Sequence, residues 1–86
     1  MYERLFLDFS KSEYTLQELE EHLWHNGYTY GFTKEYHEGY GRTVLYTFED
    51  EVYEIMTILN DRNIKYMRRK PVKNIPRQQK GKVEYI

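Results

Sequence analysis

The chain of 86 residues contains no cysteine and no alanine, and only two prolines. Without cysteine it can form no disulfide, no thiolate metal site and no thiol nucleophile. Small secreted domains often depend on disulfides, so their absence favours the cytoplasm. No apolar run approaches the roughly 20 residues that a membrane helix needs. The first residues also lack the basic region and apolar core of a signal peptide. We therefore expect one small, soluble, cytoplasmic domain.

Aromatic residues and an uneven charge distribution stand out among what the chain does contain. Aromatics make up 17% of the sequence, with ten Tyr, four Phe and one Trp. Tyrosine combines an apolar ring with a polar tip, which suits half-buried faces and interfaces. Residues 1–60 hold four Lys or Arg against twelve Asp or Glu, a net charge of −8. Residues 61–86 hold nine against two, a net charge of +7. We expect an acidic body followed by a basic C-terminal segment.

Hydrophobic periodicity and end signals predict an alternation of strands and helices. Thr15 and Glu18 have the spacing of a helix capping box, and Gly27 provides a helix stop. Asn63 is suited to the same left-handed stop position. The predicted elements are strands at 2–9, 28–37, 42–48 and 64–69, and helices at 15–26 and 50–62. This order predicts an α+β fold of the ferredoxin-like βαββαβ type, a four-stranded antiparallel sheet with two helices on one face.

Two finer expectations concern the first helix and the end of the chain. The apolar stripe of the first helix is predicted to comprise Leu16, Leu19, Leu23 and Trp24. Residues 1–70 are expected to form the α+β domain, and 71–86 a basic tail that Pro71 and Pro76 punctuate. Residues 83–86 alternate in polarity, so the tail is also a candidate for an additional edge strand.

The first candidate site is the sheet face that the helices leave uncovered. We expect Leu5, Leu7, Phe9, Val44, Tyr46 and Phe48 to face the helices. The predicted partner-binding set on the other face is then Arg4, Phe6, Leu45, Lys65, Met67 and Arg69. Apolar residues with cations at their edge suit a binding surface. The alternative is that the tail or a second copy of the chain covers this face.

The second candidate site is the basic segment, which predicts contact with single-stranded RNA or DNA. Cations neutralise phosphates, and an aromatic ring can stack on a base. The predicted nucleic-acid-binding set is Tyr66, Arg68, Arg69, Lys70, Lys73, Arg77, Lys80 and Lys82. The alternative is a solvated tail, or one that folds back on acidic helices. The RNA-recognition motif shares this element order, but residues 39–45 (GYGRTVL) lack the stacking aromatics of its third strand.

The third candidate site is a group of glutamates, which we call the acidic pole. Its predicted members are Glu13, Glu18, Glu20, Glu21, Glu35 and Glu38. Charged poles of opposite sign steer and orient a partner. A row of carboxylates can also imitate a phosphate backbone toward a nucleic-acid-binding protein, and a gel-shift competition tests that hypothesis.

Catalytic and metal-binding patterns are weak in this sequence. His22 and His25 share a helix face with Glu18, and His37 lies in the predicted hairpin turn, but a metal site needs a defined ligand count and second shell. An exposed polar face is the simpler interpretation. The only serines are Ser10 and Ser12, with no histidine at a telling spacing. The acylphosphatases share the element order, but residues 10–13 (SKSE) stand where their Gly-rich, Arg-containing loop belongs. We expect no enzyme activity, no metal and no cofactor.

The leading expectation is therefore a small non-enzymatic regulator or inhibitor that binds another protein or a protein–nucleic acid complex. Direct binding of single-stranded RNA or DNA is the alternative. A homodimer that pairs sheet faces is a third possibility. Compact chains of this kind are frequent among accessory proteins of phages and mobile elements, which often block a host factor; this rests on analogy alone.

Overall fold

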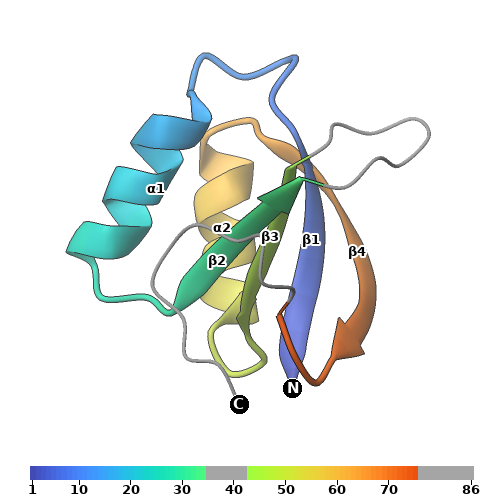
Figure 1. Cartoon of the computed structure of the whole chain (residues 1–86). Coiled ribbons are helices and arrows are strands. Elements are labelled where there is room, and N and C mark those ends of the chain that lie inside the picture. The colour runs from blue at the N-terminus through green and yellow to red at the C-terminus, as the bar shows by residue number, and fades with distance from the viewer. Residues whose placement is uncertain (35–42, 76–86) are drawn as a thin grey trace.

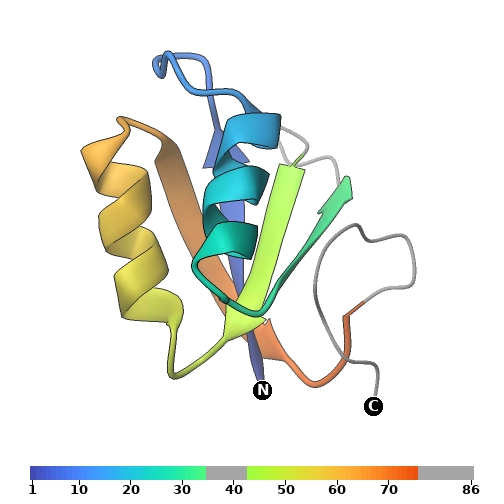
Figure 2. The same ribbon diagram turned by 90° about the vertical axis from the view of Figure 1, so that its left-hand side faces the viewer.

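The computed structural model describes residues 1–34 and 43–75, which form one sheet and two helices. The elements are β1 (Tyr2–Asp8), α1 (Leu16–His25), β2 (Tyr30–Lys34), β3 (Thr43–Phe48), α2 (Val52–Asp61) and β4 (Lys65–Val72). The sheet order is β2-β3-β1-β4 and every pairing is antiparallel. Both helices lie on one side of the sheet (Figures 1 and 2). The predicted α+β class and the ferredoxin-like element order are confirmed.

The ends of both helices follow from local sequence. The Thr15 hydroxyl accepts a hydrogen bond from the Glu18 N–H at 3.2 Å, and the Glu18 carboxylate accepts one from the Thr15 N–H at 3.0 Å. The predicted capping box is thus confirmed. Gly27 (φ 75°) follows α1, and Asn63 (φ 55°) follows α2. Glycine, and less readily asparagine, adopt this left-handed conformation, so both stops form where predicted.

A hydrophobic core fills the space between the sheet and the helices. Leucines of α1, aliphatic residues of α2 and the inward side chains of all four strands contribute to it. The buried members of this helix-side core are Leu5, Leu7, Leu19, Leu23, Tyr30, Phe32, Leu45, Val52, Ile55, Leu59 and Ile64. Thr47 also points to this side and is fully buried, with its hydroxyl donating to the Thr29 carbonyl at 3.0 Å.

The other face of the sheet carries a second buried cluster, which corrects a prediction. Its buried members, none more than 5% exposed, are Tyr2, Phe6, Val44, Tyr46 and Ile75. We call this group the second-face cluster; Phe48, Met67 and Val72 pack against it. Val44, Tyr46 and Phe48 were expected to face the helices, and Leu45 the other side. The assignment of β3 is therefore wrong by one residue.

The register of the sheet explains this error. Leu45 pairs with Leu5, and Val44 pairs with Phe6. Directly opposed residues of neighbouring strands project from the same face. Because Leu5 faces the helices, Leu45 must face them too, and Val44 follows Phe6 to the other side. In residues 43–48 (TVLYTF) the more apolar alternating set is Val44, Tyr46 and Phe48, so periodicity pointed this set toward the helices. The prediction failed because the second face has a core of its own, which takes up that set.

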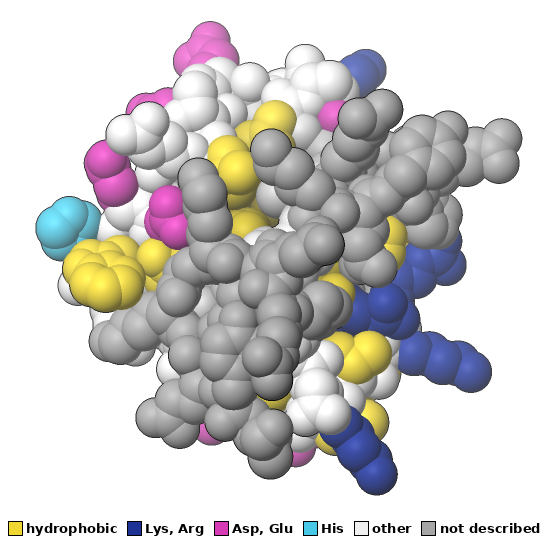
Figure 3. All heavy atoms as spheres, viewed as in Figure 1, with side chains coloured by type: hydrophobic (Ala, Val, Ile, Leu, Met, Phe, Trp, Pro, Cys, Tyr) yellow, Lys and Arg dark blue, Asp and Glu magenta, His cyan; other side chains and the backbone are white. Residues whose placement is uncertain are grey.

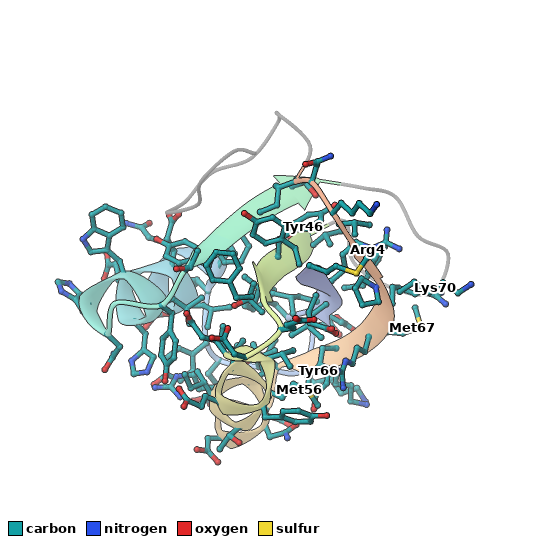
Figure 4. The ribbon with its side chains drawn as sticks, turned by 90° about the horizontal axis from the view of Figure 1, so that it is seen from below. Arg4, Tyr46, Met56, Tyr66, Met67 and Lys70 are labelled. Carbon is teal, nitrogen blue, oxygen red and sulfur yellow. The ribbon has the colours of Figure 1, made fainter. Side chains whose placement is uncertain are left out.

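The two central strands are consequently buried on both of their faces. Figure 4 shows Tyr46 and Arg4 on one side of the sheet, with Met56 and Tyr66 on the side of α2. Ile75 lies beyond β4 in the sequence and packs into the second-face cluster. The described end of the chain therefore contributes to closing the face that was expected to be open.

The end of β4 differs slightly from the expected domain division. The strand continues through Pro71 to Val72, past the boundary placed at residue 70. Proline is tolerated there because β4 is an edge strand and needs no outward hydrogen bond. The predicted hairpin turn and the candidate edge strand at 83–86 lie outside the described residues.

Replacement of Phe6 by alanine tests whether the second face is a core. We expect Phe6→Ala to lower the free energy of unfolding by about 3–5 kcal/mol, as for a buried aromatic. Trp24→Ala is the control, because Trp24 is 56% exposed and its loss should cost far less. Urea denaturation of both variants measures the difference. Equal costs would mean that the second face is not packed.

Candidate functional site

Exposed charge is divided between two sides of the domain. Figure 3 shows acidic side chains gathered over the α1 side and Lys and Arg side chains on the β4 side. The strand order places β4 at one edge of the sheet and β2, next to α1, at the other. The opposite poles that the sequence predicted along the chain are therefore also separated in space.

The partner-binding set does not form one exposed apolar surface. Leu45 is fully buried in the helix-side core, which contradicts its predicted position. Phe6 lies on the predicted face but is only 5% exposed, because the second-face cluster surrounds it. Met67 is half-buried against the same cluster. The apolar centre of the expected binding surface is thus engaged within the domain.

The cations of that set lie around the cluster. The Arg4 Nε donates to the Lys70 carbonyl at 2.9 Å, which ties β1 to β4. The Arg69 guanidinium lies 5.9 Å from the centre of the Phe6 ring, a cation–π arrangement. Lys65 is exposed. These side chains frame the closed face at its β4 edge.

Arg68 is committed to the structure of the domain. Its Nε donates to the Glu3 carboxylate at 2.8 Å, and only 7% of the Glu3 side chain is exposed. The guanidinium also lies 5.3 Å from the centre of the Tyr53 ring. The Glu3 carboxylate, followed by Tyr53, raises the pKa of Arg68. A nearly buried carboxylate without this partner would be strongly destabilising.

The nucleic-acid-binding set is also only partly exposed. Tyr66 packs against the helix-side core, so its ring is not a free stacking platform. Exposed lysines remain along β4 and just beyond it, and we call them the basic edge: Lys65, Lys70 and Lys73. The remaining predicted members, Arg77, Lys80 and Lys82, lie outside the described residues.

The acidic pole is organised by α1. Glu18 closes the capping box, so its carboxylate is already engaged. Glu13 and Glu21 are exposed, and Glu20 is half-buried on the flank of the helix. Glu35 and Glu38 lie outside the described residues.

A hollow of about 380 Å³ lies between α1 and β2. The residues that line this α1–β2 hollow are Glu20, Glu21, Trp24, His25 and Tyr30. Trp24 is 56% exposed, which corrects its predicted place in the apolar stripe. Each helical residue turns by about 100°, so Trp24 lies beside Leu23 on the flank rather than over the sheet. No pattern in the sequence indicates this hollow, because Tyr30 comes from β2 and the other lining residues come from α1.

Tyr30 forms the buried part of the hollow. It is 1% exposed and belongs to the helix-side core. Burial, followed by the negative charge of Glu20, raises the pKa of Tyr30 to about 12. The phenol therefore keeps its proton at neutral pH and retains a hydrogen-bond donor.

The two histidines of α1 lie on different flanks of the helix. His25 lines the α1–β2 hollow, whereas His22 faces α2, with its Nδ1 3.4 Å from Nη2 of Arg62. The Arg62 guanidinium also donates to the Ile58 carbonyl at 3.2 Å and lies 5.0 Å from the centre of the Tyr14 ring. Within residues 1–34 and 43–75, no three His, Cys, Asp or Glu side chains gather in a metal-binding arrangement. His37 lies outside this part of the chain.

Ser10 and Ser12 form hydrogen bonds that stabilise the loop before α1. The Ser12 hydroxyl donates to the Arg62 carbonyl at 2.6 Å and joins this loop to the end of α2. The Asp8 carboxylate accepts a hydrogen bond from the Ser10 N–H at 2.9 Å. That bond, followed by the Ser10 side chain, lowers the pKa of Asp8. These contacts are typical of turn stabilisation.

Comparison of the chain with protein-family models, curated proteins and solved structures found no match. Among the described residues, neither helix has the length and apolar character required to cross a membrane.

The His22–Arg62 contact predicts a pH-dependent stability. Burial, followed by the positive charge of Arg62, lowers the pKa of His22. The unfolded chain takes up a proton at His22 near pH 6.5, whereas the folded chain resists it until a lower pH. We therefore expect the free energy of unfolding to decrease as the pH falls from about 7.5 to about 5.5.

His22→Gln should flatten this dependence, and His25→Gln, on the other flank of α1, is the matched control. Urea denaturation at several pH values in this window measures the slope. If His22→Gln and the unsubstituted protein lose stability equally, the contact does not control the titration.

Proposed function

We propose that this chain is a small non-enzymatic regulator or inhibitor that acts in the cytoplasm by binding another protein or a protein–nucleic acid complex. One observation carries the proposal: exposed charge of opposite sign lies on two sides of a domain whose central strands are packed on both faces. The surfaces that would contact a partner are the α1 flank and the basic edge. Opposite charges orient a partner and exclude wrongly charged ones.

The α1 flank has the composition of an interface. Trp24 exposes a large aromatic ring among acidic side chains. Tryptophan and tyrosine are enriched where proteins bind one another, and they dominate the energies of such interfaces. The exposed glutamates of the acidic pole favour a partner with a basic surface, including a protein that otherwise binds nucleic acid. Blocking of a host factor by a phage or mobile-element protein is a role of this kind, supported by analogy alone.

Capture from a nuclease-treated cell extract tests protein binding. We expect the immobilised chain to retain a defined protein, and Glu20→Lys combined with Glu21→Lys to abolish retention by charge repulsion. Lys65→Glu combined with Lys73→Glu reverses the same number of charges on the basic edge and reports whether that side contributes. Quantitative mass spectrometry compares the three baits. Retention of identical proteins by all three would contradict the proposal.

Direct nucleic-acid binding is the second candidate, and the basic edge favours it. Three exposed lysines there can neutralise phosphates, each contact adding about 0.7 to the dependence of log affinity on log salt for a single strand. Phe6 is buried and Tyr66 packs against the core, so binding of this kind would depend on charge and discriminate little between sequences.

Fluorescence anisotropy with mixed-sequence single-stranded RNA and DNA measures this alternative. It predicts an affinity that falls steeply with salt and that Lys65→Gln with Lys73→Gln weakens for every sequence alike. Glu20→Gln with Glu21→Gln, on the α1 flank beside β2 at the other edge of the sheet, is the control for unrelated changes in charge. Absence of binding at low salt would eliminate this candidate.

A further inference from the structure

A nearly buried carboxylate holds an arginine at the surface between α2 and β4. Glu3 of β1 accepts a hydrogen bond from Nε of Arg68 at 2.8 Å, and 7% of the Glu3 side chain is exposed against 39% of the Arg68 side chain. The Arg68 guanidinium lies 5.3 Å from the centre of the Tyr53 ring, and Tyr53 is 67% exposed. We call Tyr53 and Arg68 the α2–β4 anchor. One end of this anchor is fixed inside the domain, and the other faces solvent.

The guanidinium of Arg68 has donors that the described part of the chain does not engage. It carries five N–H donors, and its bond to Glu3 uses only Nε. Among the described residues, Tyr53 is the one other hydrogen-bonding neighbour of Arg68. Arg62 provides a contrast, because its Nη2 lies 3.4 Å from Nδ1 of His22 and its Nε is buried. Arg62 is therefore enclosed, whereas the outer end of Arg68 remains accessible.

The buried carboxylate gives Arg68 a fixed orientation. An ion pair with a buried member adds little stability compared with an apolar pair, because the carboxylate loses its hydration. The pair does, however, remove the freedom of a long side chain, and a group that is ordered in advance costs less to bind. Arginine and tyrosine are also among the residue types that dominate the energies of protein interfaces. The anchor thus combines pre-ordered donors with an exposed aromatic ring.

The sheet edge next to the anchor is unsuited to the addition of a further strand. The pairing of β1 with β4 shifts register between Tyr2 and Arg4, as in a β-bulge. Pro71 lies in the same part of β4 and has no N–H to donate. Bulges and prolines blunt an edge strand against pairing with another chain. A partner at this edge would therefore be contacted by side chains rather than by the β4 backbone.

Charge around the anchor favours a protein carboxylate over nucleic acid. Residues 65–73 hold five Lys or Arg and no Asp or Glu, so an acidic group is attracted to Arg68. Glu49 and Asp50 are exposed just before α2 and precede Tyr53 by four and three residues. A phosphate chain that passed over both sides of the anchor would be repelled by these carboxylates within a Debye length of about 8 Å. A protein segment can instead present one carboxylate to Arg68 and other groups to the acidic turn.

We propose that the α2–β4 anchor binds an aspartate or glutamate side chain of a partner protein. The carboxylate accepts hydrogen bonds from the outer N–H groups of Arg68, and an apolar side chain of the same segment covers the Tyr53 ring. The inference rests on the proposed function and names the chemistry of its partner on the β4 side. Glu3 is a positioning residue in this arrangement, since it acts only through Arg68.

Nuclear magnetic resonance of the full chain tests this site directly. We would titrate isotope-labelled protein with a blocked pentapeptide of alternating leucine and aspartate and follow the Nε–H signal of Arg68. The matched ligand replaces aspartate by asparagine, which keeps the shape and removes the charge. The expected result is a saturable shift of the Arg68 and Tyr53 signals with the aspartate peptide alone. Absence of a saturable shift, or an equal response to the asparagine peptide, would overturn the inference.

Substitutions then separate the anchor from net charge. Arg68→Lys keeps a positive charge beside Glu3 but lacks the planar fork, and it should weaken binding of the aspartate peptide by at least about tenfold. Tyr53→Ala should weaken the same binding by at least about threefold. Tyr14→Ala is the matched control, because Tyr14 is also partly exposed and lies over the guanidinium of the enclosed Arg62. This control should change the affinity by less than about twofold, and equal losses in the two tyrosine variants would exclude the anchor.

Replacement of the buried carboxylate tests its positioning role. Glu3→Leu makes the surroundings of Arg68 more positive, so net charge alone would tighten binding of the aspartate peptide. Loss of the fixed orientation should instead weaken this binding by at least about threefold. Urea denaturation checks that the variant is folded under the conditions of the titration. Unchanged or tighter binding by Glu3→Leu would contradict the positioning role and, with it, the proposed anchor.

Two other occupants are distinguished by the same signal. A larger shift of the Arg68 signal with mixed-sequence single-stranded DNA than with the aspartate peptide would assign the anchor to nucleic acid. Self-association that shifts this signal as the protein concentration rises, and that Glu20→Gln with Glu21→Gln abolishes, would assign the anchor to the acidic flank of a second copy. Either result would overturn the partner-protein occupant, and the absence of both supports it.

The capture experiment separates this inference from the proposed function. If the chain retains a protein and Tyr53→Ala retains it equally, the anchor is wrong while the proposed function stands. If the anchor binds the aspartate peptide but no protein is retained from any extract, the proposed function fails while the carboxylate site remains. Loss of both protein and peptide in Tyr53→Ala, but not in Tyr14→Ala, supports the two together.

Discussion

The burial of β1 and β3 on both faces is the constraint from which the rest of the structure follows. Strand side chains alternate between the two faces, so a strand with large apolar residues in both alternating sets must be covered twice. In β1, Leu5 and Leu7 enter the helix-side core, while Tyr2 and Phe6 enter the second-face cluster. The two helices can cover only one face. Closure of the other face by residues such as Ile75 is therefore part of the fold.

This double burial also determines where charge can reside. A charged side chain within either layer needs a partner, and Glu3 has one in Arg68. The other charged groups are driven to the outward flanks of the helices and to the sheet edges. Because the acidic residues dominate α1 and the basic residues dominate β4, the exclusion of charge from the interior converts a gradient along the chain into two opposite sides of the domain.

The local features of this fold could be predicted from the sequence because their causes are local. The capping box joins Thr15 and Glu18 within one helical turn, and the left-handed stop at Asn63 depends on one residue. The facing of β3 could not be predicted in the same way. The alternation of residues 43–48 favours Val44, Tyr46 and Phe48 as the helix-facing set, and the pairing with β1, far away in the sequence, places them on the other face.

The candidate site was hidden from the sequence for a related reason. Trp24 and Leu23 are adjacent hydrophobic residues, and only their rotation about the helix axis separates a flank position from a core position. Tyr30 lines the hollow only because β2 lies beside α1, and no local sequence pattern predicts that neighbourhood. The charged poles were visible because composition alone reveals them. A site whose residues come from more than one helix or strand can be located only when the order of the strands in the sheet is known.

The proposed function places recognition on the helix flank rather than on the sheet face, and this difference changes the physics of binding. A flat apolar face would gain affinity from buried area, whereas the α1 flank combines long-range charge with one aromatic anchor. Under that proposal, the charges of the acidic pole would orient the approach of a partner in a salt-dependent way, and a contact that excludes water at Trp24 would slow its dissociation. Binding of this kind would leave both cores packed, because neither Trp24 nor the charged residues of the α1 flank belong to them.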